Sequence, residues 1–429
     1  MQTRMFGPML MTQAEDDSSF SSGELMSQAP AQRSPVAKQT VERSPMKLRA
    51  EEEKAIHDCT SPEFLENYFN LSRLHHLSAW KQQWQQELSA FLLKEDQTKP
   101  VAPVETTVEF GKHMLAERGV YMHVDIDCFF VSVTVREHPE LRGLPVVVCH
   151  GSRMTSEIAC ASYEARQFGI CSGMCFASAR DRCPSVVAAP YAFEAYEETS
   201  KQLYKILLSR TRNIQVVSCD EALIEITDLC RSTAVPEESL RSSAERVAEG
   251  IRQEFFESTM CTCSVGVGFH PLSARVACSL AKPDGIRSLM STEETRSTLS
   301  SMELTAIPTI GWSIMDRLRR NLGITTCGEL ASAPLTSLEG LLGKKRAATI
   351  QAFARGLDDR TVVRFRTRAS VGLCVTWGIR LKDQEGVNKL MTNFASELCK
   401  RLKQLEVAGS SLMFSVCFFY PYYICLCWL

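Results

Sequence analysis

Residues 119–133 read GVYMHVDIDCFFVSV, and this stretch decides the fold. Its first half alternates apolar, β-branched and polar residues, which predicts a buried strand. Its second half continues the apolar run and predicts a helix. Asp125 and Asp127 stand where the two elements meet, so the strand carries its acids at its tip.

A second pair of acids, Asp220 and Glu221, stands at the turn of a hairpin predicted over residues 214–226. If the two acid-bearing strands are neighbours in one sheet, Asp125 meets this pair and three carboxylates converge. Such a cluster repels itself unless cations bind, and carboxylate ligands favour Mg²⁺. Two metal ions held in this way perform phosphoryl transfer. Solvated acids at strand ends are the alternative interpretation.

Strands and helices are predicted to alternate around these acids. Residues 144–149 predict a second strand, residues 156–166 a helix, and residues 263–268 a further strand. Because a sheet buries its faces against helices, we expect one mixed α/β layer over residues 119–285.

The composition limits the classes of protein. The chain has 429 residues, enough for roughly three domains at about 150 residues each. This length excludes a mini-protein, and its 18 cysteines are too few for a disulfide scaffold and show no zinc-ribbon spacing. Residues 1–40 lack the apolar run of a signal peptide, which indicates a reducing compartment. Residues 1–57 hold few large apolar residues, so we expect a disordered tail there.

The C-terminal half has the charge pattern of a polyanion-binding protein. Residues 344–382 hold ten basic residues against two acids, in a chain whose net charge is only −2. Residues 300–360 are predicted to be helical, and a turn at 307–312 opens one helix, where free backbone N–H groups can bind a phosphate. The candidate DNA-binding residues are Ile310, Gly311, Lys344, Lys345 and Arg346.

Five motifs occur in an order and at spacings that resemble the Y-family translesion DNA polymerases. They are DIDCFF at 125–130, SYEAR at 162–166, SCDEA at 218–222, SVGVG at 264–268 and AKPDG at 281–285. The resemblance implies an α+β multidomain fold with the palm, fingers and thumb of a right-handed polymerase, an N-terminal helical extension and a partial little finger. It also implies a DNA-directed nucleotidyltransferase that uses two Mg²⁺ ions.

The same resemblance implies domain boundaries. We expect a disordered tail at 1–57, a helical extension at 58–118, a palm at 119–129 and 194–285, fingers at 130–193, a thumb with helix-hairpin-helix-like turns at 286–360, a partial little finger at 361–416 and a divergent apolar tail at 417–429. The chain is therefore expected to end inside the little finger.

The resemblance implies a role for most residues of these motifs. Asp125, Asp220 and Glu221 resemble the catalytic metal ligands, helped by the Ile126 carbonyl. Contacts to the nucleotide are implied for Asp127, Cys128, Phe129, Phe130, Cys160, Ser162, Tyr163, Arg166 and Lys282. Arg166 and Lys282 are expected to neutralise the β- and γ-phosphates, with surface cations as the alternative.

Phe130 resembles the steric gate of the family, because an aromatic ring packed under the sugar excludes a 2′-hydroxyl. A core phenylalanine is the alternative interpretation. Phe129 is a second candidate for the same role.

The stretch LSRLHHLSAW at 71–80 resembles the N-terminal extension of one eukaryotic branch of the family, the reversionless deoxycytidyl transferases. In that branch an arginine replaces the template base as the partner of the incoming nucleotide, and Arg73 is the match. Two parallel N–H donors of a guanidinium fit the O2 and N3 acceptors of cytosine. Leu74 and Leu77 are expected to fill the space from which the template guanine is expelled. A loop arginine that binds a carboxylate or a phosphate is the alternative.

The resemblance implies primer-template DNA and dCTP as partners and the nucleus as the location. Other translesion polymerase subunits are candidate partners, although the partner-binding C-terminal region of the branch has no counterpart in the sequence, and no membrane association is expected. Two other functions stay open: a catalytically weak DNA-binding form that competes or scaffolds, and a palm-fold nucleotide cyclase. The basic stretch at 344–382 argues against a cyclase, which needs no grip on a duplex.

Overall fold

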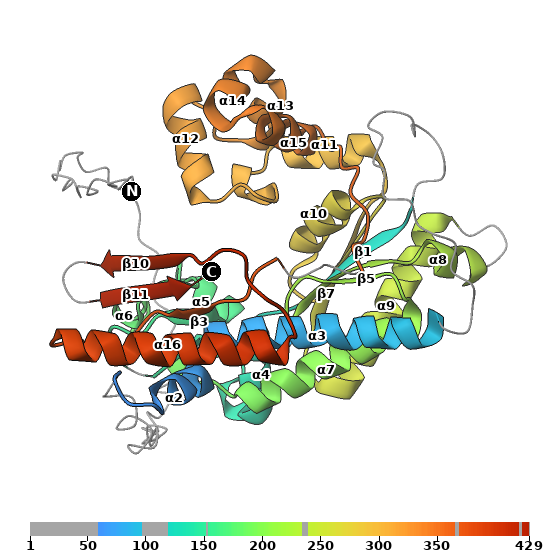
Figure 1. Ribbon diagram of the computed structural model, residues 1–429. Coiled ribbons are helices and arrows are strands. Elements are labelled where there is room, and N and C mark those ends of the chain that lie inside the picture. The colour runs from blue at the N-terminus through green and yellow to red at the C-terminus, as the bar shows by residue number, and fades with distance from the viewer. Residues whose placement is uncertain are drawn as a thin grey trace, which may run out of the picture. The chain divides into compact units, whose positions relative to one another are not determined.

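A five-stranded sheet holds the two acid-bearing segments side by side (Figure 1). In the computed structural model its order is β5-β6-β1-β7-β8. The strands are β1 (Tyr121–Ile126), β5 (Ile214–Val216), β6 (Glu221–Glu225), β7 (Cys263–Gly268) and β8 (Ile286–Leu289). β1 runs antiparallel to β6 and β7, and Asp125 stands opposite Glu221 in the register. The predicted hairpin with acids at its turn is confirmed, because β5 and β6 pair antiparallel.

The structure describes residues 59–96, 119–151, 153–233, 239–364, 369–419 and 423–428. The expected tail at 1–57 lies outside these ranges, and so does the C-terminal part of the expected extension, 97–118. Within the described ranges, none of the helices combines the length and the apolar character that crossing a bilayer requires.

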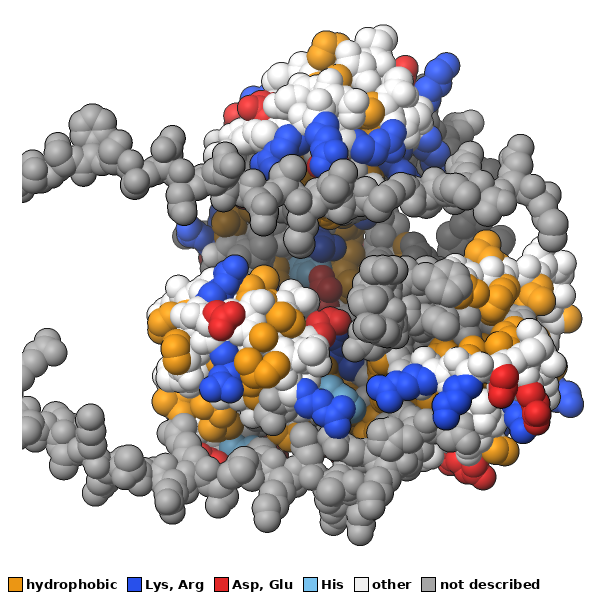
Figure 2. Space-filling model, turned by 90° about the vertical axis from the view of Figure 1, so that its left-hand side faces the viewer, with side chains coloured by type: hydrophobic (Ala, Val, Ile, Leu, Met, Phe, Trp, Pro, Cys, Tyr) orange, Lys and Arg blue, Asp and Glu red, His pale blue; other side chains and the backbone are white. Residues whose placement is uncertain are grey.

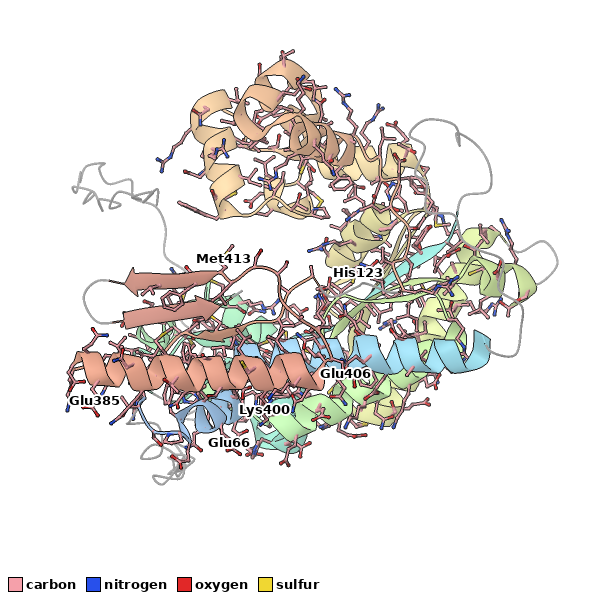
Figure 3. The ribbon with its side chains drawn as sticks, in the orientation of Figure 1. Glu66, His123, Glu385, Lys400, Glu406 and Met413 are labelled. Atoms are coloured by element: carbon pink, nitrogen blue, oxygen red, sulfur yellow. The ribbon has the colours of Figure 1, made fainter. Side chains whose placement is uncertain are left out.

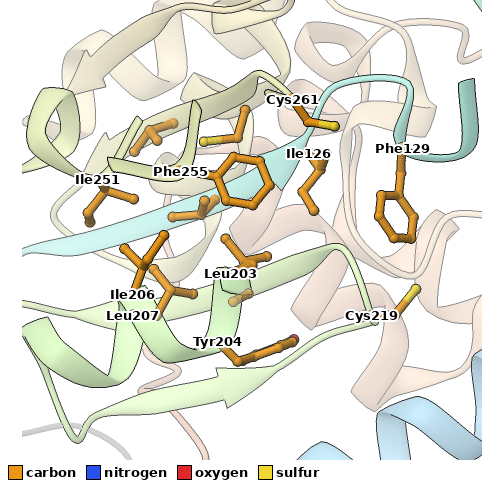
Figure 4. Close-up of a cluster of buried hydrophobic side chains, with 14 of the residues drawn as sticks. Ile126, Phe129, Leu203, Tyr204, Ile206, Leu207, Cys219, Ile251, Phe255 and Cys261 are labelled. Atoms are coloured by element: carbon orange, nitrogen blue, oxygen red, sulfur yellow. The ribbon is translucent and has the colours of Figure 1, made fainter. Parts of the chain in front are cut away.

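Helices on one face of the sheet form the main hydrophobic core (Figure 4). They are α7 (Phe193–Arg210), α8 (Thr227–Thr233) and α9 (Leu240–Thr259). Ile126 of β1 packs with Leu203 of α7 and Phe255 of α9, and all three side chains are almost completely buried. This packing fixes the strand that carries Asp125 at its tip.

On the other side, α10 (Pro271–Ala281) approaches β7 very closely. A Cβ atom at Gly266 would lie 2.0 Å from the amide nitrogen of Cys278 and 2.1 Å from the carbonyl oxygen of Ala274. A Cβ at Gly268 would lie 2.2 Å from the hydroxyl of Ser273. The glycines of the SVGVG motif are therefore required by helix–strand contact.

The segment expected to form the fingers contains a separate sheet in the order β3-β2-β4 and the helices around it. Its elements are α4 (Phe129–Glu137), η1 (Pro139–Leu141), β2 (Val146–Cys149), β3 (Ile158–Ala161), α5 (Tyr163–Arg166), α6 (Phe176–Arg182) and β4 (Val187–Ala189). The prediction of one helix over 156–166 is wrong, because β3 pairs with β2 through residue 161. The helix starts only after Ser162, whose hydroxyl caps it by accepting a hydrogen bond from the Ala165 amide.

The thumb is helical and has its own hydrophobic core. Its elements are α11 (Thr292–Ser300), η2 (Leu304–Ala306), α12 (Trp312–Leu322), α13 (Cys327–Ser332), α14 (Leu335–Leu342) and α15 (Lys344–Ala354). The expected start of the thumb at residue 286 is too early, because β8 pairs with β7 and belongs to the five-stranded sheet, which is expected to form the palm.

The C-terminal segment combines one long helix with a sheet of order β10-β11-β9. Its elements are β9 (Leu373–Val375), α16 (Gln384–Gln404), β10 (Phe414–Phe419) and β11 (Tyr423–Trp428). The expectation of a divergent tail at 417–429 is wrong, because β10 continues to Phe419 and β11 pairs with both other strands. Two aromatic, β-prone runs on either side of Pro421 are the sequence pattern behind this hairpin.

Two helices form the described part of the N-terminal extension: α2 (Phe64–Leu71) and α3 (Arg73–Asp96). α2 packs into the C-terminal segment, where Tyr68 is fully buried in one core with Phe394 and its hydroxyl accepts a hydrogen bond from the Thr376 amide at 3.0 Å. α3 packs on the palm, and the indole of Trp84 donates to the Ser200 hydroxyl of α7 at 3.1 Å. Successive helices of the extension thus belong to two different cores.

Replacing Gly266 with alanine tests the close approach of α10. We expect Gly266→Ala to lower the free energy of unfolding by about 1–3 kcal/mol or more, because the methyl group collides with backbone that cannot move aside. Chemical denaturation of the full chain measures the change. Gly250→Ala is the matched control, since a Cβ added there would meet nothing within 4 Å and alanine favours its helix. Equal effects at both positions would contradict the prediction.

Candidate active site

Asp125, Asp220 and Glu221 come together at one edge of the palm sheet. Asp125 stands near the end of β1, and Glu221 opens β6 directly opposite it. The amide of Ile126 donates to the carbonyl of Asp220 at 3.0 Å, which holds the hairpin turn against the strand tip. The three acids that the sequence singles out are therefore neighbours.

Burial and mutual repulsion change the pKa values of these acids. Burial raises the pKa of Asp220 to about 6, and the charges of Asp125 and Glu221 act in the same direction. Burial also raises the pKa of Asp125, although the Lys282 ammonium donates a hydrogen bond to it. For Glu221 burial again acts upward, but the hydrogen bond and charge of His123, together with the charges of Arg275 and Lys282, leave the pKa below its usual value.

The chemistry of this cluster fits divalent cations. Hard carboxylate oxygens and a backbone carbonyl are the ligands that Mg²⁺ prefers. Among the residues that the structure describes, no three acids, histidines or cysteines are already arranged as a metal cage. Instead the Lys282 ammonium lies against the Asp125 carboxylate and supplies the compensating charge. Cations at this edge would have to replace that ion pair.

Asp127, predicted as a nucleotide contact, turns inward. Its side chain is only 2% exposed and accepts four hydrogen bonds. The donors are the hydroxyls of Tyr163 (3.3 Å), Thr262 (3.0 Å) and Ser264 (2.7 Å), and the amide of Asp284 (2.8 Å). This carboxylate ties the fingers to the palm and is not available to a nucleotide.

Tyr163 and Arg166 lie together on the fingers beside Asp127. The Arg166 guanidinium lies over the Tyr163 ring, 4.7 Å from its centroid, and its Nε donates to the carbonyl of Ala161 at 3.1 Å. Ser162 between them is buried and caps α5. The Ser162 side chain is thus structural. Tyr163 lies near the acid-bearing strand, and the triphosphate role of Tyr163 and Arg166 stays a prediction.

Four other predicted nucleotide contacts are buried at the junction of palm and fingers: Cys128, Phe129, Phe130 and Cys160. Burial raises the pKa of the Cys128 thiol to about 12, so it stays protonated at neutral pH. Phe130 packs on Tyr196 with ring centroids 4.6 Å apart, and the Phe129 ring lies beside it. The gate role of Phe130 stays a prediction.

Arg73 is the first residue of α3 and its side chain is 22% exposed. Its Nη2 atom donates to Oε1 of Glu157 in the fingers at 3.1 Å. Leu74 is 52% exposed, and Leu77 is partly buried against the palm core. The interpretation of Arg73 as an arginine that binds a carboxylate agrees with this contact, while its role toward a nucleotide stays a prediction.

The candidate DNA-binding residues of the thumb divide into two kinds. Ile310 is buried in the thumb core, so only its backbone can face a phosphate, and Gly311 is the N-cap of α12. Lys344, Lys345 and Arg346 are exposed in the first turn of α15. Figure 2 shows Lys and Arg side chains gathered on the upper lobe, which is the thumb.

Three residues that shape the site are missing from the sequence predictions: His123, Glu157 and Asp284. His123 of the palm (Figure 3) is buried and donates from Nε2 to Glu221 at 2.8 Å. A signal for it exists, because it stands two residues before Asp125 on the same face of the strand. Asp284 stands in the AKPDG motif, two residues after Lys282, whereas Glu157 reaches the site only through a tertiary contact for which the local pattern gives no signal.

Comparisons with known proteins place this arrangement in context. The model of the impB/mucB/samB family matches residues 124–279, and that of the DNA polymerase-iota thumb domain matches residues 305–358. DNA repair protein REV1 of Arabidopsis thaliana is 35% identical over 83% of this chain and 31% of its own length. DNA repair protein rev1 of Schizosaccharomyces pombe is 35% identical over 80% of this chain and 35% of its own length. The chain thus spans about a third of these relatives.

Shorter relatives are covered more completely. DNA polymerase IV of Shewanella woodyi is 33% identical over 66% of this chain and 75% of its own length. Among solved structures, a Y-family DNA polymerase chimera is similar with a TM-score of 0.56 and 27% identity, over 66% of this chain and 80% of that chain.

Replacing Asp127 with asparagine tests its role as a buried tie. Asparagine keeps one acceptor oxygen and points an amide group at two of the four donors, so we expect Asp127→Asn to lower the free energy of unfolding by about 2–4 kcal/mol. Urea denaturation measures the loss. Asp181→Asn is the control, because Asp181 is exposed in the fingers and is expected to change stability by less than about 0.5 kcal/mol. A stable Asp127→Asn variant would show that the carboxylate is dispensable.

Proposed function

The chain belongs to the Y family of DNA polymerases, and from this membership we propose that it inserts dCMP opposite guanine, abasic or damaged template sites in translesion synthesis. The observation that carries the proposal is the cluster of Asp125, Asp220 and Glu221 in one sheet, combined with Arg73 at the start of α3. The acids support phosphoryl transfer, and the arginine supports the choice of dCTP.

Asp125, Asp220, Glu221 and the carbonyl of Ile126 are the proposed ligands of two Mg²⁺ ions. Bound there, the ions supply activation of the attacking 3′-oxygen and stabilisation of the leaving pyrophosphate. His123 orients Glu221 by donating to one of its carboxylate oxygens. The acid edge is thus prepared for cations before they bind.

The triphosphate is proposed to lie between Lys282 of the palm and Tyr163 and Arg166 of the fingers. Lys282 now neutralises Asp125, and it is free to turn toward phosphate oxygens once cations take over that carboxylate. Arg166 offers further N–H donors with a fixed orientation, because the Tyr163 ring and the Ala161 carbonyl hold its guanidinium.

Phe130 is proposed to exclude ribonucleotides from beneath the sugar. Its ring is fixed among Tyr191, Tyr196 and Phe129, so it cannot move aside without disturbing a packed aromatic group. A rigid ring excludes an additional hydroxyl group more strongly than a mobile one, because the cost of repacking adds to the steric clash.

Arg73 is proposed to read the Watson–Crick edge of cytosine. Thymine presents a donor at N3 where cytosine presents an acceptor. With dTTP an N–H group of the guanidinium would therefore face the N3–H group of thymine, and neither would have an acceptor. Leu74, exposed beside it, and Leu77 are proposed to occupy the place of the expelled template base.

Primer-template DNA is the proposed macromolecular partner, held in part by Gly311 and by Lys344, Lys345 and Arg346 of the thumb. Location in the nucleus and interaction with other translesion polymerase subunits are proposed on the basis of the REV1 relatives. The match to a polymerase thumb leaves the nucleotide cyclase without support.

Removing one acid tests the proposed chemistry. We expect Asp125→Ala to lower the rate of nucleotide incorporation by about 10³-fold or more, because a metal ligand contributes several kcal/mol to the transition state. Primer-template affinity should change little. Single-turnover primer extension and fluorescence anisotropy measure the two quantities, with Asp228→Asn, an exposed acid of α8, as the control. A wild-type chain that binds DNA without incorporating nucleotide would favour the catalytically weak DNA-binding form.

Removing the arginine tests the choice of nucleotide. We expect Arg73→Ala to lower kcat/KM for dCTP by about 5- to 150-fold, the worth of one bidentate pair, with a much smaller effect on dTTP. Steady-state incorporation of each single nucleotide opposite template guanine measures the preference. Arg142→Ala, an exposed arginine of the fingers, is the control. An unchanged dCTP preference would return Arg73 to the role of a carboxylate-binding arginine.

A further inference from the structure

The backbone at Arg73 is held from both sides. Ser72, just before it, is 3% exposed, its amide donates to the carbonyl of Phe69, and its own carbonyl accepts from the amide of His76. α2 is packed into the C-terminal core, and α3 is packed on the palm. The Cα position of Arg73 is therefore determined by two cores at once.

The Arg73 side chain, in contrast, has a long flexible stem that the backbone does not fix. An arginine loses up to about 2 kcal/mol of rotamer entropy when it is held in one conformation. Reading a base edge needs one orientation of the guanidinium plane, since the two donors must point along the acceptors of cytosine. Some other group has to select that orientation before the nucleotide arrives.

Glu157 is placed to make this selection. Its Oε1 accepts a hydrogen bond from Nη2 of Arg73 at 3.1 Å, across 84 positions of sequence. The backbone of Glu157 is itself anchored: it forms a bridge with Cys175, and the amide of Phe176 donates to the carbonyl of Ser156 at 2.8 Å. The carboxylate thus reaches Arg73 from a fixed part of the fingers.

The pair lies beside the proposed steric gate. Tyr191 packs edge-on against Phe130, with ring centroids 6.1 Å apart and an angle of 83° between the rings. The charge of Arg73 lowers the pKa of Tyr191 and the charge of Glu157 raises it, so the ion pair lies near the Tyr191 hydroxyl. The sugar of a bound nucleotide would therefore contact Phe130, and its base would contact the neighbouring pair of Arg73 and Glu157.

We propose that Glu157 is a positioning residue for Arg73 and so sets the selectivity for dCTP, an inference that rests on the proposed function of Arg73. Glu157 engages Nη2 and leaves other N–H groups of the guanidinium available to the base. Cytosine is a neutral base and offers the guanidinium no counter-charge. When the base excludes water from Arg73, the Glu157 carboxylate offsets the free-energy cost of desolvating the guanidinium. The pair is weak while Glu157 is exposed, and it strengthens when the base excludes water.

Single-nucleotide incorporation by the full chain tests this inference, with dCTP and dTTP opposite template guanine. In Glu157→Ala we expect KM for dCTP to rise about fivefold or more, with a smaller change in kcat and none in the efficiency for dTTP. Glu157→Gln should restore part of the dCTP affinity, because its amide oxygen still accepts from Nη2. Glu140→Ala is the matched control, since Glu140 is an exposed acid of the fingers in an ion pair with His138.

Three outcomes would overturn the inference. An unchanged dCTP preference in Glu157→Ala would make the ion pair an incidental surface contact. A lower KM for dCTP would mean that the carboxylate competes with the nucleotide for Arg73. A parallel loss of dCTP and dTTP use would mean a structural role, because positioning of Arg73 affects dCTP alone.

Arg73→Ala, measured beside these variants, separates this inference from the proposed function. If Arg73→Ala keeps the dCTP preference, the proposed function itself fails. If Arg73→Ala loses the preference and Glu157→Ala keeps it, only the positioning role fails. If both are correct, the double variant Arg73→Ala with Glu157→Ala is no worse than Arg73→Ala, because Glu157 then has nothing to position.

Discussion

Repulsion between carboxylates at the tip of β1 is the constraint on which the rest of the site depends. Asp125, Asp220 and Glu221 are half-buried at one end of the sheet, and their charges raise the energy of the ionised cluster. The chain compensates by bringing Lys282 to Asp125 and His123 to Glu221. A fold that concentrates acids in this way needs positive charge beside them, and the Lys282 ammonium supplies it at Asp125.

Delivery of Lys282 depends in turn on the acid that faces inward. Asp127 accepts a hydrogen bond from the amide of Asp284, two residues beyond the lysine, and another from Tyr163 of the fingers. The two aspartates of the DID sequence therefore have opposite tasks. Asp125 stands at the strand tip paired with Lys282, whereas Asp127 holds Tyr163 of the fingers and the loop that follows Lys282. One buried carboxylate thus joins palm and fingers beside the three acids of the proposed active site.

The sequence predicts what is local and misses what depends on distant pairing. The acid-bearing hairpin was predictable, because β-prone runs flank Asp220 and Glu221. The four-residue strand before Ser162 was not, since its pairing with β2 outweighs a helical pattern. The burial of Tyr68 with Phe394 was also not predictable, because no local signal links residues so far apart. For the same reason, neither the inward turn of Asp127 nor the partner of Arg73 could be read from their flanking residues.

Selection of a nucleotide by a protein side chain requires the rigidity that a template base has from stacking and pairing. At Arg73 this rigidity has three sources: α2 in the C-terminal core, α3 on the palm, and Glu157 in the fingers. The two cores fix only the backbone and Glu157 fixes only the guanidinium, so both kinds of contact are needed to hold the side chain in one orientation. A backbone fixed without the carboxylate leaves the side chain to sample many rotamers, and binding dCTP would then carry the full entropic cost of ordering it. The proposed choice of nucleotide by Arg73 would therefore be a tertiary property, distributed over segments that meet only when the fold is complete.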